Sequence, residues 1–124
     1  RAGALTVEVA MCLPVLLMVL FGCYEVGRAN MLVHATESAA YEGARAGIIP
    51  GATAEKVEAS VGRFLRSVGV REYQIKVTPG KIERDTPQID VEVVVPFDKN
   101  TFMPSFFFTN PNFTAKCSLS REIP

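Results

Sequence analysis

VAMCLPVLLMVLFGCY, residues 9–24, is a run of sixteen residues without a charged side chain. Extended back through Glu8 to Ala4, the segment has twenty-one residues, enough for an α-helix to cross a bilayer. Glu8 is its single charge. A lone carboxylate at the bilayer centre costs about 2.5 to 3.5 kcal/mol on insertion scales, and less nearer the end of the span. We therefore predict a membrane helix in which Glu8 needs a partner.

The rest of the chain is long enough for one small domain. About one hundred residues remain outside the apolar segment, which suits a single hydrophobic core. Thirteen basic and thirteen acidic residues cancel, and no block of like charge occurs. Bulk electrostatics therefore favours neither nucleic acid nor an anionic surface as partner, and we expect protein partners.

The sequence shows no catalytic or metal-binding constellation. Cys12 and Cys23 are eleven residues apart, about 16 Å along a helix, too far to pair with each other, and Cys117 is left alone. No nucleophile motif accompanies the single histidine, His34, and no glycine loop that could hold a phosphate occurs. We predict a protein that is not an enzyme and has no cofactor and no metal.

A cleaved signal peptide is the alternative to a membrane anchor. Leu20-Phe21-Gly22-Cys23 is faintly similar to the site at which lipoproteins are cut and acylated. Glu8 does not fit a basic leader region, Phe21 is bulky where a small residue is preferred, and the helical pattern continues through Cys23. We favour an anchor over residues 1–27.

A helix is expected to continue out of the membrane into the remaining domain. Residues 25–47 are rich in helix-forming Ala, Glu and Arg, and Gly47-Ile48-Ile49-Pro50-Gly51 is typical of a helix end. We assign residues 28–124 to a head outside the cytoplasm, in which the long helix covers 28–47. Glu25 and Arg28, three residues apart, are expected to form an ordinary solvated pair.

Small residues recur every fourth position on this helix and predict a smooth packing face. The row is Ala35, Ala39, Gly43 and Gly47. Such a row lets another backbone approach closely. We favour packing against the head's own core, and a subunit contact is the second interpretation.

The hydrophobic periodicity predicts one further helix and three strands. Residues 53–68 carry an apolar stripe at helical spacing, with Thr53 as N-cap. The period then changes to two in segments near 72–78, 88–95 and 113–121. The predicted fold class is α+β, with a long N-terminal transmembrane helix and a second helix packed on a three-stranded antiparallel sheet.

The connection TFMPSFFFTNPNF, residues 101–113, is unusually aromatic. It contains Phe102, Phe106, Phe107 and Phe108. Either these rings complete the small core, or they form a subunit contact or adhesive patch.

The N-terminus resembles the processing site of type IV prepilins. Gly3 precedes Ala4, and Glu8 is the fifth residue counted from Ala4. The resemblance implies that a prepilin peptidase cuts after Gly3, and that Glu8 meets the freed amine of a neighbouring subunit.

Nearly the whole chain is similar to the TadE-like family of tight-adherence pilus proteins. The similarity rests on ALTVEVAMCLPVLLMVLFGCYEVGRA (4–29), AAYEGARAG (39–47), VPF (95–97) and SRE (120–122). It implies a pilin-like or pseudopilin subunit in the cytoplasmic membrane, with its N-terminus in the cytoplasm, acting in fibre assembly and adhesion. The expected partners are other pilin-like subunits or copies of itself, the membrane and the peptidase. The alternative is a monomeric anchored or lipid-modified envelope protein whose head binds a ligand.

Overall fold

The computed structural model describes residues 1–124 except 79, 84–85, 102–110 and 122–124. Its elements follow in the order α1 (Ala2–Gly47), α2 (Ala54–Ser67), β1 (Gln74–Thr78), β2 (Gln88–Pro96), the 3-10 helix η1 (Asp98–Asn100) and β3 (Asn112–Ser120). The predicted α+β class is confirmed, and the predicted ends of the second helix and the strands differ from the observed ones by one or two residues.

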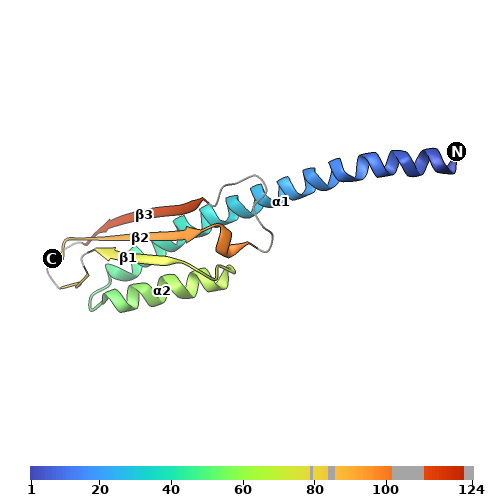
Figure 1. Ribbon diagram of the computed structural model, residues 1–124. Coiled ribbons are helices and arrows are strands. Elements are labelled where there is room, and N and C mark those ends of the chain that lie inside the picture. The colour runs from blue at the N-terminus through green and yellow to red at the C-terminus, as the bar shows by residue number, and fades with distance from the viewer. Residues whose placement is uncertain (79, 84–85, 102–110, 122–124) are drawn as a thin grey trace.

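Helix α1 is a single rod of 46 residues, about 69 Å long at 1.5 Å per residue. It runs without a break through Pro14. Its N-terminal part projects beyond the head, and its C-terminal part lies along the sheet (Figure 1). The rod ends where the Ile48 N–H bonds to the carbonyl of Ala44 at 3.2 Å, and Gly51, with φ +82°, supports the reversal that leads to α2.

Helix α2 has the N-cap that its sequence predicts. The Thr53 hydroxyl accepts a hydrogen bond from the Lys56 N–H at 3.3 Å, so it caps the helix N-terminus. The buried stripe is built on Val57, Val61 and Leu65, which are all inaccessible to solvent. Gly69, with φ +84°, then turns the chain towards β1.

The sheet has the order β1-β2-β3, and both pairings are antiparallel. Val91 of the central strand β2 lies opposite Val77 of β1 and Cys117 of β3. The inward residues of β2 are Ile89, Val91, Val93 and Val95, and each of them is fully buried. Inward residues of β1 and β3 are only half-buried, since these strands form the edges.

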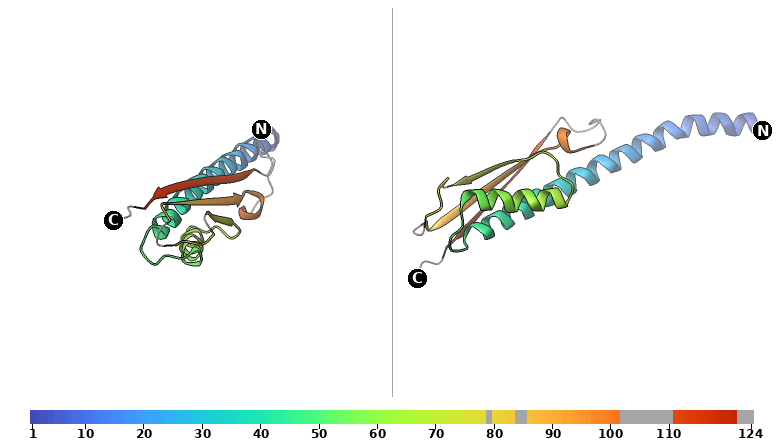
Figure 2. Two further views of the ribbon diagram at one scale, coloured as in Figure 1. Left: turned by 90° about the vertical axis from the view of Figure 1, so that its left-hand side faces the viewer. Right: turned by 90° about the horizontal axis from the view of Figure 1, so that it is seen from below.

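Both helices lie on the same side of the sheet and enclose the core (Figure 2). Helix α1 packs against β2 and β3, whereas α2 packs against α1 and β1. Close approach depends on two glycines of α1: a Cβ atom on Gly43 would overlap the Val61 side chain, and one on Gly47 would come within 3.1 Å of Ile89. The head is therefore built directly on the C-terminal part of α1.

Candidate functional site

The N-terminal part of α1 presents an uncovered apolar surface. Its large hydrophobic side chains between Leu5 and Leu20 are exposed, from 41% at Leu17 to 73% at Met11. By length and composition, α1 is the one helix among the described residues that could cross a membrane, and none of its most apolar stretch is buried in the structure. An exposed apolar surface of this length calls for lipid or other apolar helices as its surroundings.

Glu8 lies in this surface as an exposed carboxylate and makes no ion pair with any described residue. Cys12 follows four residues later, so both side chains lie on one face of the helix. Cys23 is eleven residues beyond Cys12, close to three full turns, and falls near the same face. Both cysteines are exposed, and α1 continues through Cys23.

Gly3 and Ala4, the predicted processing site, lie exposed in the first turn of α1. A Cβ atom on Gly3 would have no other atom within 4 Å. The described part of the chain therefore leaves the bond between these residues uncovered.

The small-residue row of α1 faces the core of its own head. The exposed fraction is 7% at Ala35 and zero at Ala39, and Gly43 and Gly47 are also buried. These residues contact the inner side chains of α2 and β2. The row is therefore covered within one chain.

Phe102, Phe106, Phe107 and Phe108 lie outside the residues that the structure describes. Phe113, at the start of β3, packs edge-on against the buried Phe97, with ring centroids 6.0 Å apart and an interplanar angle of 86°.

Asn100 joins several segments at the end of the head from which the apolar rod projects. Its side chain is almost fully buried. The Oδ1 atom accepts hydrogen bonds from the backbone N–H groups of Arg71 at 2.8 Å and Glu72 at 3.0 Å. The Nδ2 atom donates to the carbonyls of Glu72 and Pro96, both at 2.8 Å. One amide therefore holds the entry to β1 against the exit from β2.

Arg28, a residue of α1, binds the backbone on either side of this junction. Its Nε donates to the Asn100 carbonyl at 2.9 Å, and its Nη2 approaches the Gly69 carbonyl at 3.5 Å. The prediction of a solvated Glu25–Arg28 pair was wrong. Glu25 is only 1% exposed, and the long-range carbonyl contacts direct the Arg28 guanidinium towards the turn after α2.

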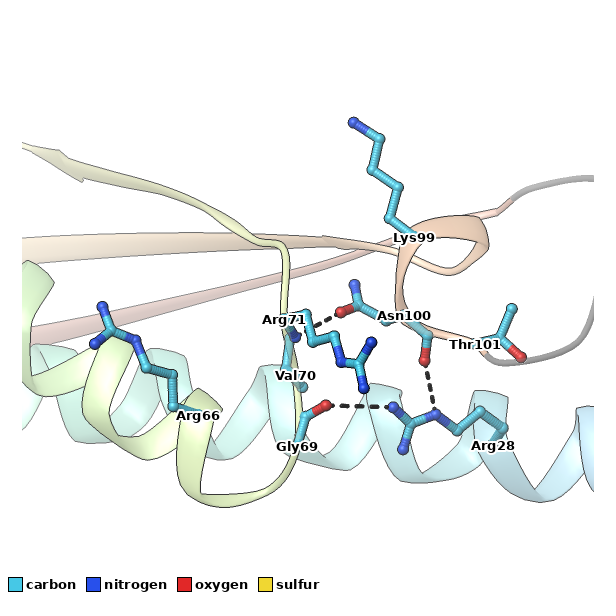
Figure 3. A pocket seen from close by; sticks show the side chains of 8 residues that line it. All are labelled: Arg28, Arg66, Gly69, Val70, Arg71, Lys99, Asn100 and Thr101. Atoms are coloured by element: carbon cyan, nitrogen blue, oxygen red, sulfur yellow. Dashed lines mark hydrogen bonds between the residues drawn. The ribbon is translucent and has the colours of Figure 1, made fainter.

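A pocket of about 550 Å³ lies at this junction. Four cationic side chains line it together with residues 69–70 and 100–101 (Figure 3); they are Arg28, Arg66, Arg71 and Lys99. We call it the basic pocket. The side chains of Arg28 and Arg71 extend into the space beside Gly69, whereas those of Arg66 and Lys99 start at its rim and point away from it. No carboxylate lines it among the described residues.

Arg121 performs a structural task at the opposite end of the head. Its guanidinium donates to the carbonyls of Gly47 at 3.3 Å, Ile48 at 3.2 Å and Ile49 at 3.0 Å, where α1 ends. It also donates to the Glu83 carbonyl at 3.0 Å. A cation at this position stabilises the negative end of the helix dipole.

A protein-family model matches most of helix α1. Residues 3–45 match the family model described as TadE-like protein. The expected resemblance is confirmed over this segment, and the similar residues 95–97 and 120–122 lie outside it. No curated protein and no solved structure matches the chain.

The TadE-like segment coincides with nearly all of α1 and contains Glu8, Arg28 and most of the small-residue row. The match relates residues 3–45 to TadE-like proteins, and the apolar helix is long enough to anchor the chain in a membrane. The basic pocket is only partly inside it, since Arg28 belongs to the TadE-like segment and the other three cations come from the head.

Little in the head indicates reaction chemistry. The described residues contain no group of three or more His, Cys, Asp or Glu side chains that could hold a metal ion. On the outer face of the sheet, the Ser118 hydroxyl donates to the Asp90 carboxylate and lowers the pKa of that carboxyl below its ordinary value. This pair is exposed and belongs to neither the basic pocket nor the pocket beside it.

Proposed function

We propose that this chain is a non-enzymatic, pilin-like subunit that takes part in assembling a surface pilus or fibre for adhesion. The single observation that carries the proposal is the TadE-like rod, whose apolar N-terminal part is exposed and carries one carboxylate. Residues 1–27 serve as the anchor in the cytoplasmic membrane, and residues 28–124 form the head outside the cytoplasm.

Glu8 is the proposed assembly contact. Burying it unpaired in a bilayer is unfavourable, and a neighbouring subunit that offers a cation or hydrogen-bond donors offsets this cost. In the prepilin-like scheme, cleavage between Gly3 and Ala4 creates an amine that is such a partner. The neighbours are other pilin-like subunits or copies of this chain, and their apolar helices pack laterally.

The natural cysteines supply a direct test. Cys12 lies one turn from Glu8 on the same face, so a subunit that meets Glu8 also passes close to Cys12. We expect a bis-maleimide to cross-link Cys12 to a neighbouring chain in native membranes, in a Cys117→Ala background that removes the head thiol. Mass spectrometry of the product identifies the neighbour.

The variant Glu8→Ala should lower the yield of this cross-link at least fivefold and leave the head folded, since Glu8 contacts nothing in it. Glu58→Ala is the matched control because Glu58 is an exposed carboxylate on α2, a helix of the head, and not in the apolar N-terminal part of α1. An undiminished cross-link in Glu8→Ala membranes, with insertion intact, would rule out Glu8 as the assembly contact.

A further inference from the structure

We propose that the basic pocket binds the phosphate of an anionic phospholipid from the membrane in which α1 is anchored. The inference rests on the anchoring part of the proposed function. It adds a ligand class and a site to that function, since the pocket is formed by the head and α1 together.

The pocket lies at the depth of lipid headgroups. Arg28 follows Tyr24, the last residue of the uncharged run, by four residues, which corresponds to about 6 Å along the helix axis. A headgroup layer extends roughly 5 to 7 Å beyond the hydrocarbon core on each side of a bilayer. A helix that spans the core with its apolar run therefore brings Arg28 to the level of the phosphates.

The pocket concentrates positive charge in a chain that is neutral overall. Arg66, Arg71 and Lys99 also line a second, adjoining pocket of about 440 Å³, so the basic surface continues up the head. The carboxylate that lines this second pocket is Glu72, which pairs with Lys99 at 3.4 Å. Arg28 and Arg66 make no ion pair with any described carboxylate. Among the described residues that line the two pockets, four are cationic and one is a carboxylate.

Arg28 is held in place without being neutralised. Its hydrogen bonds go to the carbonyls of Asn100 and Gly69 and to the Met31 sulfur, and none of these groups carries a formal charge. They use three of its five N–H donors. A guanidinium fixed in this way offers its remaining donors in the planar arrangement that suits phosphate oxygens. Arg71 extends into the same space (Figure 3).

Lipid phosphate fits these observations better than free phosphate because the site is beside the membrane surface. Anionic lipids attract nearby Lys and Arg side chains, and each such side chain strengthens binding about fivefold. Anchoring by α1 also keeps the pocket permanently within reach of the headgroups, so a modest intrinsic affinity is sufficient.

The test is a titration of the ¹⁵N-labelled full chain in zwitterionic micelles with short-chain phosphatidylglycerol. We expect saturable shifts of the backbone amides of Gly69, Val70 and Asn100. The double variant Arg66→Gln/Arg71→Gln should raise the fitted Kd at least fivefold. Arg45→Gln/Arg63→Gln is the matched control, since both arginines are exposed helix residues outside the pocket, and its Kd should stay within twofold.

Two comparison titrations separate the sources of phosphate. Short-chain phosphatidylcholine should produce no saturable shift at these amides, and inorganic phosphate should bind at least tenfold more weakly than phosphatidylglycerol. Inorganic phosphate of equal affinity would overturn the lipid assignment in favour of a soluble anion. An equal loss of affinity in both double variants would show that the overall charge of the chain, and not the basic pocket, determines lipid binding. This result would refute the proposed site.

Anchoring itself is measured separately. If α1 is in the micelle, Cys12 is protected from a water-soluble maleimide in every variant. Labelling of Cys12 would contradict the proposed function, whereas a protected Cys12 without a phosphatidylglycerol response would contradict only the lipid site. The amide spectrum of β2 verifies that the double variants are folded.

Discussion

Replacing Asn100 by alanine tests whether one buried amide holds the base of the head together. The substitution removes four hydrogen bonds and leaves the N–H groups of Arg71 and Glu72 and two carbonyls without these partners. Each bond contributes about 0.5 to 1.5 kcal/mol, which gives roughly 2 to 6 kcal/mol for the four. Water can reach the exposed residues 71–72 and recover part of the loss. We therefore expect Asn100→Ala to reduce the free energy of unfolding by about 3 kcal/mol.

Thermal unfolding of the full chain in micelles measures this loss. The β2 amide signals should be followed, because the apolar part of α1 remains helical in the micelle and would dominate a helix signal. For a domain of this size, 1 kcal/mol lowers the Tm by about 4 to 8 °C, so a shift of about 12 to 24 °C is expected. Asn30→Ala, at an exposed position of α1, is the control and should change stability by less than about 0.5 kcal/mol.

An isosteric substitution distinguishes the lost hydrogen bonds from the cavity left by alanine. Asn100→Asp keeps the acceptor of the two N–H groups but places a carboxylate oxygen against the carbonyls of Glu72 and Pro96. Asn100→Asp therefore loses the two Nδ2 bonds without opening a cavity, so at pH 7 it should recover less than half of the stability that Asn100→Ala loses.

The reasoning is refuted by either of two results. A loss below about 1 kcal/mol in Asn100→Ala would mean that the junction is held by other contacts. An Asn100→Asp variant as stable as wild type at pH 7 would mean that the Nδ2 contacts with the two carbonyls are energetically unimportant.

Two further predictions concern packing and the end of α1. Gly43→Ala should destabilise the head by about 1 to 2 kcal/mol. Overlap of the new methyl group with Val61 costs about 1 to 3 kcal/mol, and the better helix propensity of alanine offsets up to about 1 kcal/mol of this. A variant that is more stable than wild type in urea unfolding would contradict the close contact. Arg121→Ala should lower the free energy of unfolding by about 2 to 3 kcal/mol, because it removes charged hydrogen bonds at the C-terminus of α1. Arg121→Lys should restore less than half of this loss. Equal urea midpoints for Arg121→Lys and wild type would show that the positive charge alone is sufficient.

The secondary structure could be predicted because its causes are local. Three patterns each indicate an element within a short stretch of sequence: the uncharged run, the glycines near the ends of both helices, and the alternation in residues 88–95. The small-residue row could also be recognised, since its four-residue spacing defines one face of α1 before the partner of that face is known.

The base of the head could not be predicted because its causes are distant in sequence. Asn100 bonds to groups 28 and 29 residues away, and Arg28 bonds to a carbonyl 72 residues away. The local spacing of Glu25 and Arg28 indicated a surface pair, but Glu25 is buried and Arg28 binds carbonyls across the junction. The four cations of the basic pocket come from positions 28, 66, 71 and 99, so no window of sequence reveals them as a cluster.

The unbroken course of α1 links the proposed assembly contact to the position of the head. Each residue of an α-helix adds about 100° of rotation, so Arg28 lies roughly 200° around the axis from Glu8, and Ala39, which is buried in the core, lies roughly 220° from it. The head therefore packs on the side of α1 opposite the face that carries Glu8 and Cys12. A neighbouring helix can approach Glu8 without meeting this chain's own head, which is the arrangement that lateral packing in a fibre requires. Because α1 continues into the head without a linker, the angle between Glu8 and Ala39 around the helix axis also determines which side of the head faces away from the neighbouring subunit.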